Sequence, residues 1–464
     1  MMRGIVKVSV EREEVAVSAA GEEPGESGGA ACGDAALHAL AGAARAELDV
    51  FSRGNAGTRA ELFLSAGRRL TLEYEASTTA FTLNRGGSLL AAARVWQGEH
   101  SGFAALPVSG PVELARVLEA ARQRMGTSPP PSLPELLDPA GSAPPSFPDL
   151  SAERSRSLAE HLLRTVVPPG RVVQAALLTQ SVTRTVLVRG EGGCSWGGSS
   201  REDAFVRCET PRGAIVDAVA SPLGQPWPLE SLRARLAQAV EVLEGPAEPV
   251  DPDLPLVLRP AVAVPLVEAL AWLLRGDVGA SLPALVRAVG KKPFPSVLSV
   301  QDDPRHPLGT QRLETDDEGM PACPLGLIEE GGLRGFLHST GTAARLGVEP
   351  NGRGLRLEGA PPAPCPINLF VVPRGDALPE RYTELVARVE TFTTMPRPGL
   401  VSLMAGGWEV HEGRRVRRVA PVDLSLPVLE TFRMLRGVGS DLAFFPTAGG
   451  CGTPTLVFPP LLRG

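Results

Sequence analysis

Apolar residues along the chain follow two different spacings. Leu70, Leu72 and Tyr74 alternate with polar residues, as in a half-exposed strand. PVELARVLEAARQRMG (residues 111–126) instead places apolar residues three and four positions apart, as in an amphipathic helix. After residue 251 strands and turns predominate, and we expect helices there only at residues 265–277, 379–391 and 427–438. The pattern therefore predicts a mixed α+β protein.

Glycine-containing segments separate the predicted strands. GRR (residues 67–69), RGG (residues 85–87) and QGEHSG (residues 97–102) are expected to be turns in the amino half. EEGG (residues 329–332) and HEGR (residues 411–414) have the residues typical of hairpin turns. His411 would then lie at a hairpin tip.

The spacing of these elements divides the chain into five segments. A tail that is acidic, rich in glycine and poor in large apolar residues is expected to be disordered, and a proline-rich stretch reads as a linker. The expected segments are the tail at 1–35, an amino-terminal α/β unit at 36–127, the linker at 128–150, a central α/β unit at 151–250 and a β-rich domain at 251–464.

Charge and composition exclude several functions. The net charge is −6, which argues against a nucleic-acid-binding protein with a basic face. We find neither a run of about 20 apolar residues, as a membrane-spanning helix requires, nor a signal-peptide pattern. The cysteines are scattered without a CxxC pair, so we expect reduced thiols and a cytoplasmic protein.

One carboxylate interrupts an otherwise apolar helix. PLVEALAWLLRGD (residues 265–277) carries Glu268, which shares a helical stripe with Trp272 and Arg275. This stripe is expected to be a solvated or interface face. Elsewhere, Asp302 and Asp303, and the DDE of residues 316–318, are expected to be solvated turn residues, because no calcium-loop spacing surrounds them. His338 is expected to be a structural histidine with satisfied hydrogen bonds.

The order of motifs in the carboxyl half resembles that of the TldD/PmbA family, whose PmbA branch is also called TldE. The matching segments, in chain order, are LVEALAWLLRGD, SVQDDP, TDDEGMP, GLIEEGGLRGFLHSTGTAARLG, NGR, PINLF, GGWEVHEGRRVRR, LRGVGSDL and CGTPTLVFPPLLRG. DDEG followed by LIEEGGL is distinctive as a pair. The amino half fits more loosely, through its order of helices and hairpins. The resemblance implies an α/β amino-terminal domain with antiparallel sheets and a β-rich carboxyl-terminal domain.

The resemblance also implies a specific chemistry. The TldD branch resembles a metallopeptidase in which an HExxxH helix supplies two histidine ligands and an acid/base glutamate. On this chain the histidine positions fall on Val267 and Trp272, and the glutamate falls on Glu268. The alternative to a solvated or interface face is thus that Glu268 is a vestigial acid/base residue that lines a peptide cavity. Neither a valine nor an indole can donate a lone pair to zinc, and one carboxylate alone neither holds the ion nor activates its water.

Further candidate positions follow from the same resemblance. Cys451 is expected to be a buried structural thiol, and the alternative is that it corresponds to the Cys–Gly that completes the metal site in the TldD branch. Asn351 and Arg353, in the NGR segment, are candidates for substrate contact, and so is Asn368. Cys365 and Pro366 stand before Asn368, where the TldD branch has a further arginine.

We therefore expect a non-catalytic, TldE-like subunit with Glu268 as a vestigial acid/base residue. It would bind no cofactor, zinc would belong to a TldD-like partner in a hetero- or homodimer, and the substrate would be a peptide. We expect no nucleic-acid or membrane partner. The alternatives are an active metallopeptidase with non-standard ligands and a stand-alone peptide-binding scaffold.

Overall fold

The structure is a computed structural model of the chain. It describes residues 11–13, 29–77, 80–127, 133, 136, 150–166, 173–190, 193–357, 359–390, 399–447 and 449–462.

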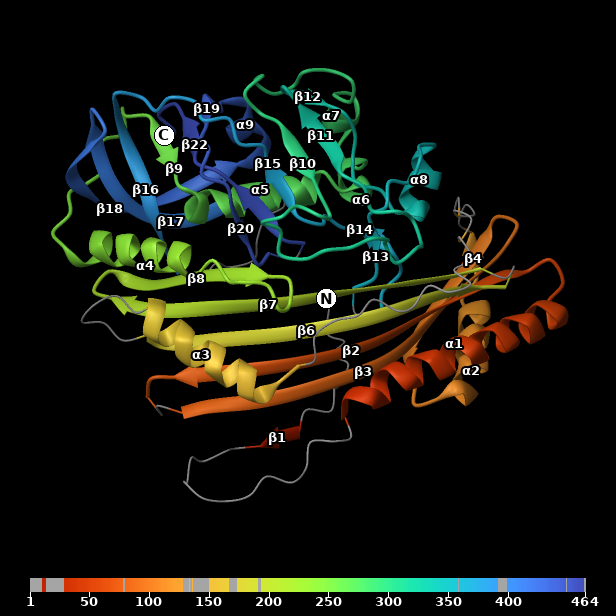
Figure 1. The fold of residues 1–464 in the computed structure, drawn as a ribbon. Helices are drawn as coiled ribbons and strands as arrows, with labels where there is room; N and C mark the ends of the chain where they lie inside the picture. Colours follow the sequence, from red (N-terminus) through yellow and green to blue (C-terminus); the bar gives the residue numbers. More distant parts are fainter. Residues whose placement is uncertain are drawn as a thin grey trace, which may run out of the picture.

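A long antiparallel sheet forms the amino half (Figure 1). Its main strands are β2 (Arg59–Glu75), β3 (Ala80–Gln97), β4 (His100–Pro107), β6 (Val173–Arg189), β7 (Cys194–Thr210) and β8 (Gly213–Ser221). Short strands β1 (Glu11–Glu13) and β5 (Gly126–Thr127) pair with β3 and β4. β2 pairs with β6 from Glu61↔Arg189 to Glu75↔Ala175, so the two predicted α/β units share one sheet.

Four helices cover parts of this sheet. They are α1 (Gly29–Gly54), α2 (Leu114–Gln123, preceded by the 3₁₀ turn Pro111–Glu113), α3 (Ala152–Val166) and α4 (Leu229–Glu244). α1 and α2 pack at one end of the long strands, around a core that includes Leu48, Leu62 and Leu118. α3 and α4 pack at the other end, where α4 also contacts the carboxyl half (Figure 1).

The carboxyl half extends the large sheet and adds a second one. β9 (Leu256–Leu258), β16 (Arg381–Val389), β17 (Leu400–His411), β18 (Arg414–Pro427), β19 (Gly437–Val438) and β22 (Leu456–Phe458) join the large sheet. The second sheet contains β12 (Gly332–Leu333), β11 (Leu325–Glu329), β10 (Val300–Asp302), β15 (Leu369–Val371), β21 (Cys451–Thr453) and β20 (Ala443–Phe445). Short elements complete this half: β13 (Gly354–Leu355), β14 (Ala363–Pro364), α6 (Gly276–Gly279), α7 (Pro283–Val286), α8 (Thr340–Leu346) and α9 (Val428–Arg433).

Helix α5 (Pro260–Leu273) lies between the two sheets. Its buried residues join a core with strands of the large sheet, such as β9 and β16, and with β10, β15 and β21 of the second sheet. A helix buried from several sides must be apolar on most of its surface, which explains its composition.

The predicted α+β class and family-type architecture are confirmed. The hairpin turns at EEGG and HEGR are confirmed as well: Glu330, Gly331, Glu412 and Gly413 all have positive φ, between β11 and β12 and between β17 and β18.

Two sets of local predictions were wrong. GRR and RGG are not turns, because β2 and β3 run straight through them and Gly67 pairs with Ser88. A Cβ on Gly67 would lie 2.7 Å from the Ser88 hydroxyl, so glycine allows a close approach of the two strands there. The helix expected at residues 379–391 is strand β16, buried along most of its length between β9 and β17.

The predicted tail and linker lie mostly outside the described residues. Within the tail range, β1 and the first turns of α1 are described. Within the linker range, Leu136 packs on Phe63 and Leu187 of the large sheet. Among the described helices, none is both long and apolar enough to cross a membrane.

Candidate functional site

The candidate site is built on α5. The chain enters the helix from β9 through Arg259, and Pro260 occupies the first turn, where its missing N–H costs nothing. A second proline, Pro265, lies inside the helix. After Leu273 the chain turns, and the Gly276 N–H donates to the Leu337 carbonyl, which fixes the start of α6.

The two positions that the resemblance assigns to histidine ligands lie in different surroundings. Val267 has no exposed surface and belongs to the core between the sheets. Trp272 is 50% exposed. The Arg275 guanidinium lies 4.1 Å from its ring centroid and forms an ion pair of 2.6 Å with Asp277. Apolar packing is thus observed for Val267, whereas Trp272 is a half-exposed ring covered by a cation.

Cys451 lies on β21, directly against α5. It is 1% exposed, and burial raises the pKa of its thiol to about 12. A hydrogen bond with Thr447 lowers this pKa, while the nearby carboxylates of Glu268 and Asp302 raise it further. At neutral pH Cys451 is therefore a protonated thiol and a poor nucleophile.

These residues do not fit a zinc site. Of the four positions, Val267 and Trp272 carry no donor, which leaves Glu268 and Cys451, fewer than the three or four donors that zinc requires. Within the described part of the chain, the one group of three potential metal ligands is Glu380, His411 and Glu412, at the exposed β17–β18 hairpin tip. It lies on different elements from α5 and β21.

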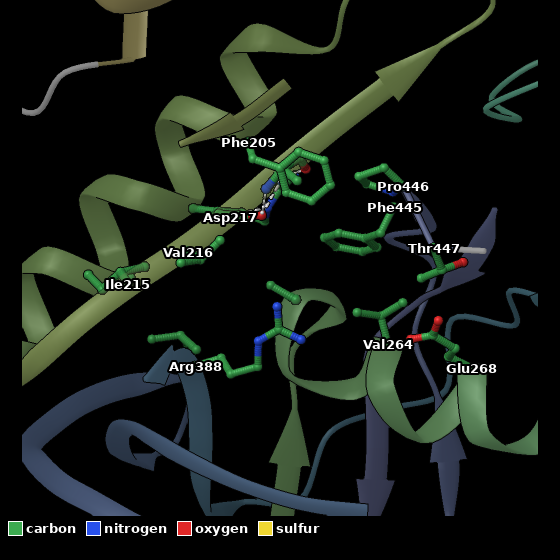
Figure 2. A pocket seen from close by; sticks show the side chains of 15 residues that line it. Phe205, Ile215, Val216, Asp217, Val264, Glu268, Arg388, Phe445, Pro446 and Thr447 are labelled. Carbon is green, nitrogen blue, oxygen red and sulfur yellow. Dashed lines mark hydrogen bonds and ion pairs between the residues drawn. The ribbon is translucent and has the colours of Figure 1, made fainter. Parts of the chain in front are cut away.

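Glu268 faces a cavity of about 260 Å³ at the meeting point of α4, α5, β8 and β16. Figure 2 shows Glu268 and Val264 projecting from α5 on one side, with Asp217 and Phe205 on the opposite side. Arg388 reaches into the cavity from β16. Phe445, Pro446 and Thr447 close a further side.

The cavity wall holds one neutralised ion pair. Arg235 on α4 donates from Nε to Asp217 at 2.7 Å and from Nη2 to the same carboxylate at 3.0 Å. The Arg235 guanidinium also lies 5.0 Å from the Phe445 ring centroid. No local sequence pattern indicates this pair, because Arg235 and Asp217 come from elements that meet only in the folded protein.

Three carboxylates of the acidic turns are buried, so the prediction that they are solvated was wrong for these three, while Asp303 and Asp317 are partly exposed. Asp302 and Glu318 have no exposed surface, and Asp316 is 5% exposed. Asp302 forms a buried ion pair with Arg353, and its carboxylate accepts from the Ile367 N–H at 2.8 Å. Buried carboxylates of this kind organise loops rather than face solvent.

Two of the three residues predicted to contact substrate are also fully buried. The Arg353 guanidinium donates to Asp302 and to the carbonyls of Asn351, Gly352 and Cys323. The Asn368 side chain accepts from the Thr310 N–H at 2.9 Å and donates to the Gln311 carbonyl at 2.8 Å.

Asn351 stabilises the segment before α8 through two hydrogen bonds between its side chain and the backbone of that segment. It accepts from the His338 N–H and donates to the Phe336 carbonyl, each at 2.8 Å. Their surroundings give Asn351, Arg353 and Asn368 structural roles, and contact with a peptide stays a prediction. His338 is buried, but its Nδ1 has no hydrogen-bond partner in the described part of the chain, so the expected full satisfaction was wrong. Burial lowers the pKa of His338.

Glu318 connects the acidic loop to the amino half. Arg94 on β3 forms ion pairs with Glu318 at 2.9 Å and with Glu61 on β2 at 2.8 Å. Arg189 on β6 donates to the Glu318 carbonyl, and Arg356 pairs with Glu61 at 3.0 Å. The DDEG motif, read as a turn in the sequence, is therefore the anchor between the two halves.

Comparison with known proteins agrees with this architecture. Residues 252–461 match the model of the PmbA/TldA metallopeptidase C-terminal domain. A metalloprotease of Synechocystis is 28% identical over 206 residues, which cover 43% of this chain and 44% of that protein. A metalloprotease of Methanothermobacter thermautotrophicus is 30% identical over 174 residues, covering 35% of this chain and 37% of that protein. The match thus spans less than half the length of these two relatives.

Two solved structures share the fold over most of its length. TldE from Thermococcus kodakarensis aligns with a TM-score of 0.74 and 18% identity, covering 90% of this chain and 98% of that one. A protein from Thermotoga maritima described as a modulator of a DNA gyrase aligns with a TM-score of 0.71 and 18% identity, covering 89% and 98%.

The β-rich carboxyl half is thus a metallopeptidase-type domain, with its helix between two sheets. Residues 252–461 therefore belong to the PmbA/TldA-type metallopeptidase C-terminal domain, and the whole chain has the fold seen in TldE from Thermococcus kodakarensis.

Proposed function

We propose that this chain is a non-catalytic subunit that pairs with a TldD-type chain carrying an intact HExxxH helix. The observation that carries the proposal is the state of the two ligand positions on α5. Val267 is packed into the core and Trp272 lies under Arg275, so neither position presents a metal donor. In the pair, this chain would contribute a wall of the peptide-binding chamber, and the partner would contribute zinc.

Glu268 fits a vestigial role in this proposal. Its position on α5 keeps it at the cavity, but the residues beside it cannot complete a metal site. The alternative of catalysis through Cys451 is disfavoured, because a nucleophilic cysteine reacts as the thiolate and burial keeps this thiol protonated.

The proposed substrates are peptides, including modified peptide precursors, and the proposed location is the cytoplasm. A reducing compartment agrees with the described cysteines, Cys194, Cys208, Cys323, Cys365 and Cys451, which are all free thiols.

Co-expression with an HExxxH-bearing relative from the same genome tests the pairing. We expect the two chains to co-purify, and we expect the complex, but neither this chain alone nor a complex whose partner has lost its HExxxH glutamate, to cleave peptides. Chelator-sensitive cleavage by this chain alone would contradict the proposal. If no such relative binds the chain, the hypothesis of a stand-alone peptide-binding scaffold replaces that of a heterodimer.

A further inference from the structure

Arg388 lies between two adjoining hollows. It lines the cavity of about 260 Å³ that Glu268 faces, and also a second hollow of about 330 Å³, which includes Pro265 and Ser402. Val216 on β8 is the other residue common to both. Each volume is near the lower end of the range for small-ligand pockets, about 300–1,000 Å³. The space suits one or two residues of a peptide rather than a long segment.

Glu268 lines the first cavity together with Arg388 but forms no ion pair with it, and the other carboxylates nearby are matched to other groups. Asp217 is engaged by Arg235, as described above, and Glu390 in the second hollow forms an ion pair of 2.9 Å with Arg207. Glu384, on the same strand, is paired with Arg259 and with Arg415. No carboxylate of these pairs is left for Arg388.

The half-buried Arg388 side chain forms neither an ion pair nor a hydrogen bond with any residue that the structure describes. Figure 2 shows its guanidinium extended into the cavity, with Val216 on one side and Val264 on the other. A guanidinium partly removed from water gains most when a carboxylate binds it through two parallel hydrogen bonds.

We propose that Arg388 binds the carboxylate at the carboxyl terminus of a peptide, and that the apolar wall receives the side chain of the last residue. Phe205, Val264 and Phe445 form much of that wall. Peptide as the ligand class rests on the proposed function. The assignment of the ligand group to a chain-terminal carboxylate rests on the position of Arg388 and on the small volume of the cavity. The chain would thus recognise peptide ends and present the rest of the peptide to its partner.

Calorimetric titration of the full chain with three blocked tripeptides tests this assignment. The probes are acetyl-Ala-Ala-Phe with a free carboxylate, the same peptide ending in an amide, and acetyl-Ala-Glu-Phe-amide, which carries its carboxylate on a side chain. A charge-assisted hydrogen bond contributes about 1.5–3 kcal/mol, so we expect the free acid to bind roughly 10–100-fold more tightly than its amide.

Arg388→Gln should remove this preference, so that acid and amide bind alike, and Arg388→Lys should keep part of it. Arg388→Gln in the protein and the change from acid to amide in the peptide together form a double-mutant cycle. This cycle isolates the contact between the guanidinium and the carboxylate. Arg345→Gln, on the exposed surface of α8, is the matched control and should bind like the wild type. Thermal unfolding of each variant shows whether the fold is kept.

Three results would overturn the inference: equal binding of acid and amide by the wild type, an unchanged preference in Arg388→Gln, or no binding of any probe at millimolar concentration. A preference for the side-chain carboxylate would overturn the assignment to a chain terminus. If Arg388→Gln loses the preference but still pairs with its HExxxH partner, both proposals stand. If peptides fail to bind while pairing persists, only this inference falls.

Discussion

Val267 and Trp272, the two positions that the resemblance assigns to ligand histidines, have physically different surroundings. The valine fills space in a core from which water is excluded. The tryptophan stays half exposed and stacks against Arg275, which is itself tied to Asp277. Restoring histidine should therefore have unequal consequences at the two positions, although both belong to one helix.

Val267→His should lower the free energy of unfolding by about 2–4 kcal/mol, because it overfills a packed site and buries a polar ring. Trp272→His should cost less than about 1 kcal/mol, the scale of a lost exposed cation–π contact. Urea unfolding measures both, with Val267→Ala as the control for lost volume. A Val267→His protein as stable as the wild type would show that this position is not part of the core.

At the scale of elements, the acidic loop of residues 315–320 carries much of the contact between the halves. Glu318 receives Arg94 from β3, and the Thr340 N–H of α8 donates to the Glu318 carboxylate at 2.6 Å. Asp317 accepts from the Arg356 N–H at 2.7 Å. Burial, reinforced by the nearby Glu318 carboxylate, raises the pKa of Asp317 to about 6, although Arg356 opposes the shift.

This shift predicts a pH dependence of stability. A carboxyl with a raised pKa in the folded state favours folding most below its usual pKa, and that contribution is lost as the pH rises through about 4 to 6. Between pH 4 and pH 7 the wild type should lose about 3 kcal/mol of unfolding free energy relative to Asp317→Asn, at about 1.4 kcal/mol for each pH unit. Denaturant unfolding across this range measures the difference.

Asp423→Asn, an exposed carboxylate on β18, is the control and should run parallel to the wild type. A wild type that gains stability relative to Asp317→Asn over this range would reverse the sign and contradict a raised pKa.

Sequence patterns correctly predicted those elements whose conformation depends on residues close in sequence. The hairpin turns at residues 329–332 and 411–414 depend on their own glycines, and both were identified correctly. β16 was mistaken for a helix because Tyr382, Leu385, Val386 and Val389 have helical spacing. Only its pairing with β9 and β17 makes it a strand, and that pairing is absent from any local pattern.

The same limit applies to the candidate site. The absence of histidine at positions 267 and 272 can be read from the sequence, and its meaning rests on the resemblance to the HExxxH helix. The role of Arg388 could not, because a helix at residues 379–391 would have given its side chain a different direction. The buried Glu318 anchor was missed because Arg94 lies far from it in sequence and reaches it only across the large sheet.

At the scale of the whole molecule, one sheet continues from the amino half into the carboxyl half. The ion pairs of Arg94, Arg189 and Arg356 with Glu61 reinforce this continuity where the acidic loop meets β2, β3 and β6. Such a frame holds α5 and its cavity in place. Under the proposed function, this chain would keep the shape of the peptidase domain while a partner supplies the chemistry.

The zinc content of the purified chain, alone and in complex with its HExxxH partner, tests this account most directly. We predict no zinc above background in the chain alone, and stoichiometric zinc in the complex that is lost when the partner's histidines are replaced and kept in Glu268→Gln of this chain. Stoichiometric zinc in the chain alone, released by Cys451→Ser, would contradict the account.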